Sequence, residues 1–276
     1  MNKVRVLLSI MLLGGLLVLS GCASDKKDKD APDDTPVEQL YNKAANDLDS
    51  KHYELAAHGF EEVERQHPYS QWATRAELMA AFAYYKNLDY DESVIALDRF
   101  TELHPGNKDI DYAYYLKALC YYEQITDVAR DQAMTEQALN ALETLIRRYP
   151  DSRYSRDAKL KRDLVLDHLA GKEMEIGRYY LNRGYVNAAL NRFRVVVKDY
   201  QTTTHVPEAL HRMVEGYMTL GLRDQATRVA AVLGYNYPGS KWYEDSYALL
   251  DPDQRQTLMD KRGWMDRTID SLFKPE

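Results

Sequence analysis

Cys22 is the residue whose setting points most clearly to a chemical reaction. Residues 1–5 carry two basic side chains, residues 6–19 are predominantly apolar, and the small residues Ser20 and Gly21 follow. This order is typical of a signal peptide and its cleavage point. The apolar run has about 14 residues, which is short of the ~20 that a membrane-spanning helix needs. We therefore expect residues 1–21 to be a signal peptide that is removed before Cys22.

The segment Leu19-Ser20-Gly21-Cys22 resembles the bacterial lipobox. In a lipobox the cysteine thiol receives a diacylglycerol through a thioether, and the new N-terminus receives an N-acyl chain. Each buried methylene contributes roughly 0.8 kcal/mol to membrane binding, so two or three chains would anchor Cys22 almost permanently. Ala23 follows the cysteine where an aspartate would favour the inner membrane, so we expect the periplasmic face of the outer membrane. The alternative is an ordinary signal peptide with a coincidental cysteine.

The composition narrows the choice of partner. The formal net charge is −7 over 276 residues, and the absence of a basic stripe argues against nucleic acid. Residues 22–36 are charged, punctuated by proline and without apolar periodicity, which indicates a flexible tether. Once Cys22 is lipidated, only Cys120 keeps a thiol, and no intramolecular disulfide can form. Cys120 stands in an apolar helical stretch, where a buried core thiol is favoured.

No arrangement of residues in the sequence suggests catalysis. The seven histidines form no H-E-x-x-H site, and no C-x-x-C pair or glycine-rich phosphate loop is present. No serine stands in a nucleophile elbow. We therefore expect a protein that is not an enzyme and that has no metal ion or cofactor apart from the lipid on Cys22.

Five short landmarks recur along the chain. They are His67-Pro68, His104-Pro105, Tyr149-Pro150, Tyr200-Gln201 and Tyr237-Pro238, with spacings of 37, 45, 51 and 37 residues. A proline shortly after a helix prevents the helix from continuing. The landmarks therefore predict the ends of five related helices, and the fourth lacks its proline.

Three columns of side chains precede the landmarks at fixed distances. Positions are counted back from the second residue of each landmark. The column five positions back contains Val63, Phe100, Leu145, Val196 and Leu233, and the column eight positions back contains Phe60, Leu97, Leu142, Phe193 and Ala230. The column twelve positions back, which we call the innermost, contains Ala56, Ser93, Ala138, Ala189 and Ala226. Offsets of three and four residues define one face of a helix. Because the innermost column is always small, a neighbouring helix can approach closely there.

Each of these helices is preceded by another apolar helical pattern, and a helix pair per ~34–37 residues that closes on proline is typical of tetratricopeptide repeats (TPRs). We predict an all-α superhelical array of about five TPR helix pairs over residues 37–240, and a C-terminal extension over residues 241–276. The two longer periods require longer helices or an inserted loop. Residues 126–135 are polar enough for the loop, and residues 155–182 are a candidate for one extended helix, with a bend near Gly171 as the alternative. The first helices of such an array line a concave groove.

The chain has 22 tyrosines, and four doublets fall on the predicted first helices: Tyr84-Tyr85, Tyr114-Tyr115, Tyr121-Tyr122 and Tyr179-Tyr180. Adjacent helical residues point ~100° apart, so one tyrosine of a doublet can pack inward while the other faces the groove. Tyrosine offers rigid contact area and a hydroxyl group. Tyr84, Tyr85, Tyr114 and Tyr115 are therefore candidates for a peptide-binding groove. The alternative is that all of them are packing residues of the repeats.

Several segments resemble one family in order and spacing. They are "AYYKN" (83–87), "DRF" (98–100), "LHPGNKDIDYAYYLKAL" (103–119), "RRYPDSRYSRDA" (147–158) and "RYYLNRGYVNAALNRFRVVVKDY" (178–200). Behind a lipobox and a short charged tether, they resemble the BamD family, the TPR lipoproteins of the outer-membrane β-barrel assembly (BAM) machinery. The resemblance covers about residues 37–235.

The resemblance implies a non-catalytic scaffold. C-terminal repeats would bind the POTRA domains of a BamA-like barrel protein, N-terminal repeats would bind unfolded outer-membrane proteins, and accessory BAM lipoproteins are further partners. It places Arg192 at the BamA contact, with Arg183 and Tyr180 as weaker candidates just upstream. The loop near residues 126–135 and the extension at residues 241–276 depart from the family pattern. The alternative function is that of another TPR lipoprotein, an adaptor for envelope hydrolases or proteases.

Arg192 also has a local argument in its favour. Its neighbours in the repeat columns occupy the packing face, so Arg192 points away from the centre of that face. An arginine in this position can pair with a carboxylate of a partner in bidentate fashion. The alternative is a solvated arginine or an ion pair within the chain, for which Asp199 and Glu175 are the candidates.

The lipobox gives a direct prediction. The substitution Cys22→Ala removes the thiol that the lipid requires, so we expect an uncleaved precursor or a soluble protein in place of the anchored form. Membrane fractionation with an alkaline wash and mass spectrometry of the N-terminus measure both outcomes. Retention of the variant in the outer membrane with no lipid on its N-terminus would contradict the lipobox assignment.

Overall fold

The computed structural model describes residues 35–260, and all secondary structure elements within this range are α-helices. Their bounds are α2 Val37–Asp49, α3 Tyr53–Gln66, α4 Gln71–Asn87, α5 Tyr90–Leu103, α6 Ile110–Tyr122, α7 Ala133–Arg148, α8 Arg153–Asn182, α9 Val186–Asp199, α10 Val206–Thr219, α11 Arg223–Asn236, α12 Lys241–Leu249 and α13 Pro252–Asp260. None of these helices is both long and apolar enough to cross a membrane. Cys22 and the predicted signal peptide lie outside the described residues.

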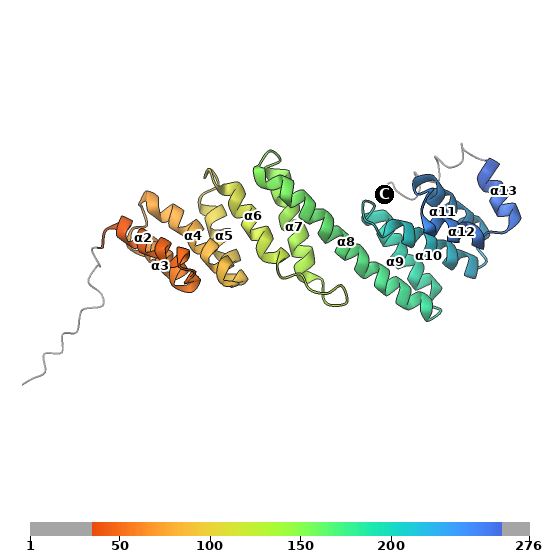
Figure 1. Ribbon diagram of the computed structural model, residues 1–276, viewed down its shortest axis with the longest axis horizontal. Coiled ribbons are helices and arrows are strands. Elements are labelled where there is room, and N and C mark those ends of the chain that lie inside the picture. Colours follow the sequence, from red (N-terminus) through yellow and green to blue (C-terminus); the bar gives the residue numbers. More distant parts are fainter. Residues whose placement is uncertain (1–34, 261–276) are drawn as a thin grey trace, which may run out of the picture. The chain divides into compact units, whose positions relative to one another are not determined.

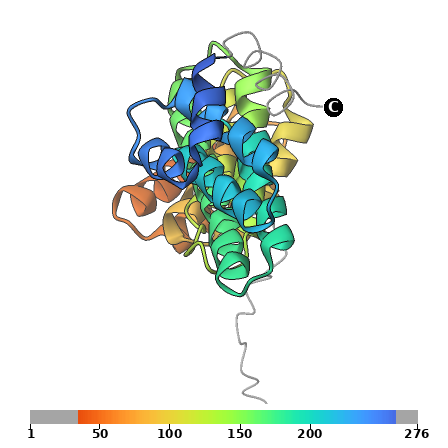
Figure 2. The same ribbon diagram turned by 90° about the vertical axis from the view of Figure 1, so that its right-hand side faces the viewer.

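The helices pack as consecutive pairs. α2 packs on α3, α4 on α5, α6 on α7, α8 on α9 and α10 on α11, and the second helix of each pair also packs on the first helix of the next. The successive pairs stand side by side in chain order (Figure 1), and Figure 2 views the same array from one end, so that the pairs overlap. This arrangement confirms the predicted all-α array of five helix pairs.

The five landmark residues end their helices in the same way. His67, His104, Tyr149, Tyr200 and Tyr237 are the C-cap residues, with φ between −135° and −123° and ψ between 43° and 60°. Each donates its N–H to the carbonyl four residues earlier, at 2.8–3.1 Å, and accepts from the N–H three residues later, at 3.0–3.1 Å. The repeat therefore consists of a defined turn as well as a column of side chains.

Tyr200 shows that the proline is not essential for this turn. Gln201 follows it in place of proline, yet its backbone has the same conformation as the other four caps. Thr203 closes the turn with two hydrogen bonds to the Tyr200 carbonyl, from its N–H at 3.1 Å and its hydroxyl at 2.8 Å. A threonine hydroxyl can take part in a local turn in this way.

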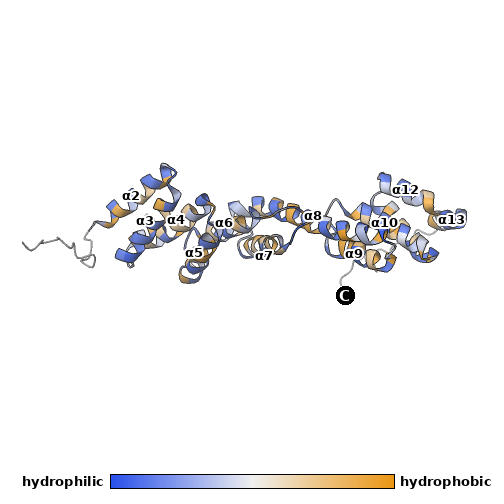
Figure 3. Ribbon diagram, turned by 90° about the horizontal axis from the view of Figure 1, so that it is seen from below, coloured by the Kyte–Doolittle hydropathy of each residue, from blue (hydrophilic) through white to orange (hydrophobic). Residues whose placement is uncertain are grey.

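The three predicted columns form the core. All fifteen of their side chains are at most 1% exposed, including the three large rings of Phe60, Phe100 and Phe193. Hydrophobic and hydrophilic residues alternate along the helices (Figure 3), as expected where a helix buries one face. Ser93 is the one polar member, and its hydroxyl donates to the carbonyl of Ala81 on the paired helix at 2.8 Å. The repeat register read from the sequence is confirmed.

α8 is one continuous helix of 30 residues that packs on both α7 and α9. It begins at Arg153, two residues before the predicted start, because the Ser152 hydroxyl accepts from the N–H of Tyr154 and caps it. Close approach to α9 requires Gly177, where an added Cβ would stand 2.4 Å from the ring of Phe193. The extended helix is thereby confirmed, and it joins the first three pairs to the last two.

The predicted loop near residues 126–135 is wrong at its C-terminal end. α7 begins at Ala133, because the Asp131 carboxylate accepts from the Ala133 N–H at 2.9 Å and starts the helix early. Thr135 is consequently a buried helical residue. The polar segment between the helices covers residues 123–132.

The core makes a stability prediction. Replacing Phe193 by alanine should lower the free energy of unfolding by about 3–5 kcal/mol, because the ring fills the space between α8 and α9 above Gly177. Chemical denaturation measures the difference. The control is Leu103→Ala, at a side chain that is 59% exposed, where we expect a change of less than about 0.5 kcal/mol. Equal effects of the two substitutions would contradict the repeat register.

Candidate partner-binding surfaces

Arg192 lies on α9 and forms an ion pair within the chain. Its Nη1 donates to both carboxylate oxygens of Glu173 on α8, at 3.2 and 3.1 Å, and its side chain is 42% exposed. The pairing within the chain that the sequence left open therefore exists, but Glu173 is the partner and not Glu175 or Asp199. A guanidinium carries five N–H donors, so the pair leaves donors available on the exposed side.

Arg183 and Tyr180 belong to the turn between α8 and α9. The Arg183 guanidinium lies 5.1 Å from the centre of the Tyr179 ring, and Tyr180 contacts the rings of Tyr179 and Tyr185 at 5.8 and 6.4 Å. Arg183 is exposed, whereas Tyr180 is half-buried. Arg183 stands ten positions beyond Glu173, which corresponds to about 15 Å along a helix. The structure therefore separates this turn from the Arg192 pair.

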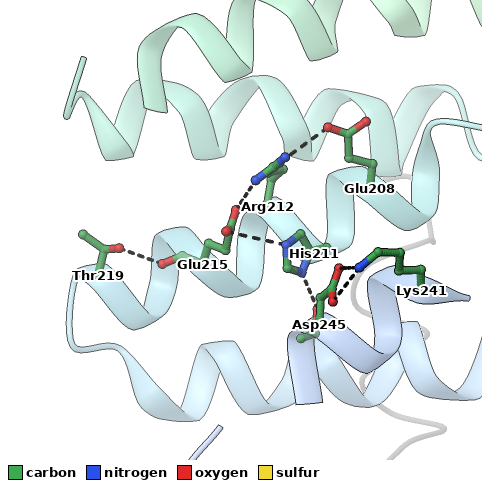
Figure 4. A network of polar contacts seen from close by, with 8 residues as sticks. Glu208, His211, Arg212, Glu215, Thr219, Lys241 and Asp245 are labelled. Atoms are coloured by element: carbon green, nitrogen blue, oxygen red, sulfur yellow. Dashed lines mark hydrogen bonds and ion pairs between the residues drawn. The ribbon is translucent and has the colours of Figure 1, made fainter. Parts of the chain in front are cut away.

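A polar network in the C-terminal repeats connects α10 to α12 (Figure 4), and the pair of Arg178 with Glu208 extends it to α8. Arg178 of α8 donates to Glu208 of α10 at 3.1 Å. Within α10, Arg212 lies 3.5 Å from Glu208 and 2.8 Å from Glu215. Charged residues at offsets of three and four on one helix were the signal that could have predicted this chain of ion pairs.

His211 is the buried centre of the same network. It is 5% exposed, its Nδ1 lies 2.8 Å from the Ser246 hydroxyl of α12, and its ring centre lies 5.3 Å from that of Trp242. Burial holds the pKa of His211 below its ordinary value. The charge of Glu215 raises this pKa in part, and the charge of Arg212 lowers it further. The contacts of His211 with Ser246 and Trp242 therefore hold α12, the first helix of the C-terminal extension, against α10 of the fifth pair.

A pocket of about 700 Å³ opens between α4, the end of α5 and the turn before α6. Trp72, Arg75 and Leu78 of α4 line one side, and Lys108 and Phe100 line the other. Asp109 lines the same pocket, so two cations and one carboxylate stand beside the aromatic wall. The excess positive charge suits a carboxylate of an extended peptide segment. Trp72 and Arg75 stand three positions apart on one helical face, but no candidate of the sequence analysis lies among the lining residues.

The side chains of the first two tyrosine doublets contact other residues of the same chain. Tyr84 is 9% exposed and donates to Glu61 at 2.6 Å, and Tyr85 packs 6.0 Å from the ring of Tyr90. Burial is the first cause that raises the pKa of Tyr84, followed by the hydrogen bond to Glu61. These contacts favour packing for the first doublet, and its role in a groove stays a prediction.

The second doublet connects α6 to later helices. Tyr114 accepts from Arg148 at 2.6 Å, and Tyr115 donates to Asp157 at 2.6 Å and stacks on Tyr154 at 5.0 Å. The rings of Tyr114 and Tyr115 are partly buried. Their role in peptide binding likewise stays a prediction, with packing favoured by the contacts.

Within residues 35–260, the histidine, cysteine and carboxylate side chains form no group of three that could hold a metal ion. Cys120 is fully buried, its thiol lies 3.3 Å from the Ser93 hydroxyl, and burial raises its pKa to about 11. A thiol with such a pKa is protonated at neutral pH and is a poor nucleophile. The contacts are those of a core residue.

Five helix pairs that end in the same turn define the class of this protein as an array of TPR-type repeats. The family described as YfiO, outer membrane lipoprotein, matches residues 33–233. The chain belongs to this family, which includes the BamD outer membrane protein assembly factors.

The relatives with similar sequences align with most of this chain. The BamD assembly factor of Caulobacter vibrioides is 52% identical over 84% of this chain and 77% of that protein. The Rickettsia prowazekii BamD is 48% identical over 90% of this chain and 98% of that protein. A solved TPR domain of P58(IPK) is similar at a TM-score of 0.40 and 12% identity, over 86% of this chain and 64% of that one. The family assignment rests on the sequence relatives alone.

The buried histidine gives a pH prediction. Because the pKa of His211 is lowered on folding, its contribution to stability is present above its unfolded pKa of about 6.5 and is lost as the pH falls below that value. We expect the melting temperature of the chain to fall more steeply between pH about 7 and about 5 than that of His211→Gln, whose amide can still bond to Ser246. Parallel pH profiles for the two proteins would contradict this role.

Proposed function

We propose that this chain is a lipid-anchored, non-catalytic scaffold for the assembly of β-barrel proteins into the outer membrane. Three observations support the proposal: the lipobox at Cys22, the array of TPR pairs and the membership of a family of outer membrane protein assembly factors. The lipid on Cys22 would hold residues 37–260 at the periplasmic face of the membrane.

The C-terminal repeats would bind the periplasmic POTRA domains of a BamA-like barrel protein. The observation that carries this step is the geometry of Arg192. Glu173 fixes one Nη atom, while 42% of the side chain stays exposed. A guanidinium that is oriented in advance loses less side-chain entropy when it meets a second carboxylate. Arg183 and Tyr180 at the α8–α9 turn are weaker candidates for the same contact.

The N-terminal repeats would receive segments of unfolded outer-membrane proteins. The pocket beside Trp72 has the chemistry for this role, because Arg75 and Lys108 offer positive charge next to an aromatic wall. Arg75 also lies 5.4 Å from the centre of the Tyr41 ring, which holds it at the rim. An extended segment could place a carboxylate between the two cations.

The second candidate function is that of an adaptor for envelope hydrolases or proteases, since such an adaptor would have the same anchor and the same repeats. Family membership favours the assembly factor. Detergent extraction of the outer membrane followed by co-purification distinguishes the two, because a BamA-like barrel protein should accompany an assembly factor. Accessory lipoproteins of the machinery would be identified in the same experiment.

The docking step makes a prediction about affinity. The substitution Arg192→Glu should weaken binding of the POTRA domains at least tenfold, about 1.4 kcal/mol, because a carboxylate replaces the guanidinium beside Glu173. Calorimetric titration of the chain with the periplasmic domains of the BamA-like partner measures this change. A reversed charge at the partner's carboxylate should restore part of the affinity.

The matched control is Arg194→Glu. Arg194 stands two positions away on α9, is exposed, and bonds to Asn191 at 2.7 Å and to the Tyr217 hydroxyl at 3.3 Å. It carries the same charge, so a general electrostatic effect would appear in both variants. Unchanged affinity for a folded Arg192→Glu variant would remove Arg192 from the interface.

A further inference from the structure

A groove runs along one side of α8, beside the loop between α6 and α7. Two adjoining pockets of about 470 and 410 Å³ form it, and they share Leu164 and His168 as a common wall. The first pocket lies toward the end of α6, and the second extends to His205 at the start of α10. We call this feature the α8 groove. α8 itself can be followed between α7 and α9 in Figure 1.

The α8 groove occupies a face of the helix different from the one that holds the Arg192 pair. Its lining residues on α8 recur from Leu164 to Arg178 at offsets of 3, 4, 7, 11 and 14 residues, which is the spacing of a single helical face. Glu173 stands two positions from Gly171, and therefore points about 160° away from it. The groove is thus separate from the surface proposed for the POTRA domains.

One end of the α8 groove is apolar and open. Leu164 is 60% exposed and Leu160, one turn earlier, is 63% exposed. Tyr122, Ile125 and Val165 line the adjoining pocket together with Glu123 and Thr126. Two exposed leucines one helical turn apart, beside a mainly apolar hollow, form an apolar patch, which marks an interaction site more often than isolated apolar residues do.

The other end is acidic. Asp127 and Glu175 are exposed and line the pocket, and within residues 35–260 neither forms an ion pair. Asp167 accepts from Thr204 at 2.8 Å and lies 3.5 Å from the His205 ring. Arg178 also lines this end and is already paired with Glu208, and the Lys172 ammonium donates to the carbonyl of Ala129 at 2.8 Å. Three carboxylates, Asp127, Asp167 and Glu175, therefore face one cation that has no carboxylate partner, Lys172, and the net charge of this end is negative, which complements a basic side chain.

His168 stands between the two ends with an unsatisfied atom. Its Nε2 is buried, and within the described part of the chain it has no hydrogen-bond partner. Because that atom is buried, a ligand that crosses this wall would contact the exposed part of the His168 ring.

We propose that the α8 groove binds an extended segment of another polypeptide that carries an apolar side chain and, farther along, a lysine or arginine. The apolar side chain would sit against Leu160 and Leu164, the backbone would pass His168, and the basic side chain would reach Asp127 and Glu175. From Leu164 to Glu175 the helix advances about 16 Å, which an extended chain covers in about five residues. This spacing defines the partner's sequence pattern.

The probe is a synthetic peptide of glycine and serine with one leucine and one arginine five positions later. The control peptide carries glutamate in place of the arginine. Binding to the full lipidated chain in detergent micelles is followed by NMR of the imidazole signals, which are few because the chain has seven histidines. The variant His168→Gln assigns the signal of His168.

We expect the leucine–arginine peptide to shift the His168 signal in a saturable way, and the control peptide to leave it unchanged. The double reversal of Asp127→Lys and Glu175→Lys should raise the dissociation constant at least about fivefold. The matched control, Glu136→Lys with Glu143→Lys, reverses two exposed acidic residues of α7 and should leave it unchanged. Raising the salt concentration from about 50 to about 500 mM should weaken binding to the unmodified chain.

Three results would overturn the proposal. The first is no shift of His168 at about 5 mM peptide, a concentration that would reveal even millimolar affinity. The second is equal binding of the two peptides, and the third is binding that neither salt nor the double reversal weakens. Because the α8 groove lies away from Arg192, each of these results leaves the POTRA interface as proposed.

Discussion

The structure depends on one constraint: a single helix pair cannot bury its own apolar face. Each pair therefore needs the next one, and the buried columns that include Phe60, Leu97, Leu142 and Phe193 are the places where neighbouring helices meet. The small residues twelve positions before each landmark allow the helices to approach, and the repeated cap turn directs the chain into the next pair. In such an array, stability comes from contacts between neighbours, so the surfaces can vary while the core stays the same.

α8 follows from the same constraint in a special form. One helix of 30 residues packs on α7 near its start and on α9 near its end. The face toward α9 holds Gly177 against Phe193 and Glu173 against Arg192. Another face forms the wall of the α8 groove. The helix that joins the two halves of the array is consequently also the one with the most varied surface.

The polar contacts have a different role from the apolar columns. Columns recur and make the pairs equivalent, whereas contacts such as His211 with Ser246, or Tyr115 with Asp157, occur once and fix a particular neighbour. A buried polar group is tolerated only when it finds a partner, so these contacts select one arrangement among similar pairs. They also place charged side chains at defined points on the surface, as a binding scaffold requires.

The sequence by itself determined the all-α fold, the number of helix pairs and their register, because the columns and landmarks are periodic and depend on nothing distant. It also indicated an extended helix over residues 155–182, and it set the lipobox chemistry expected at Cys22. Only the tertiary structure decided which carboxylate Arg192 meets, since Glu173 lies on another helix and several acidic residues were equally plausible by spacing. The sequence likewise did not predict the pocket beside Trp72 or the α8 groove. Both are formed by side chains from elements that are separated in the sequence, and contacts between such elements produce no periodic pattern along the chain.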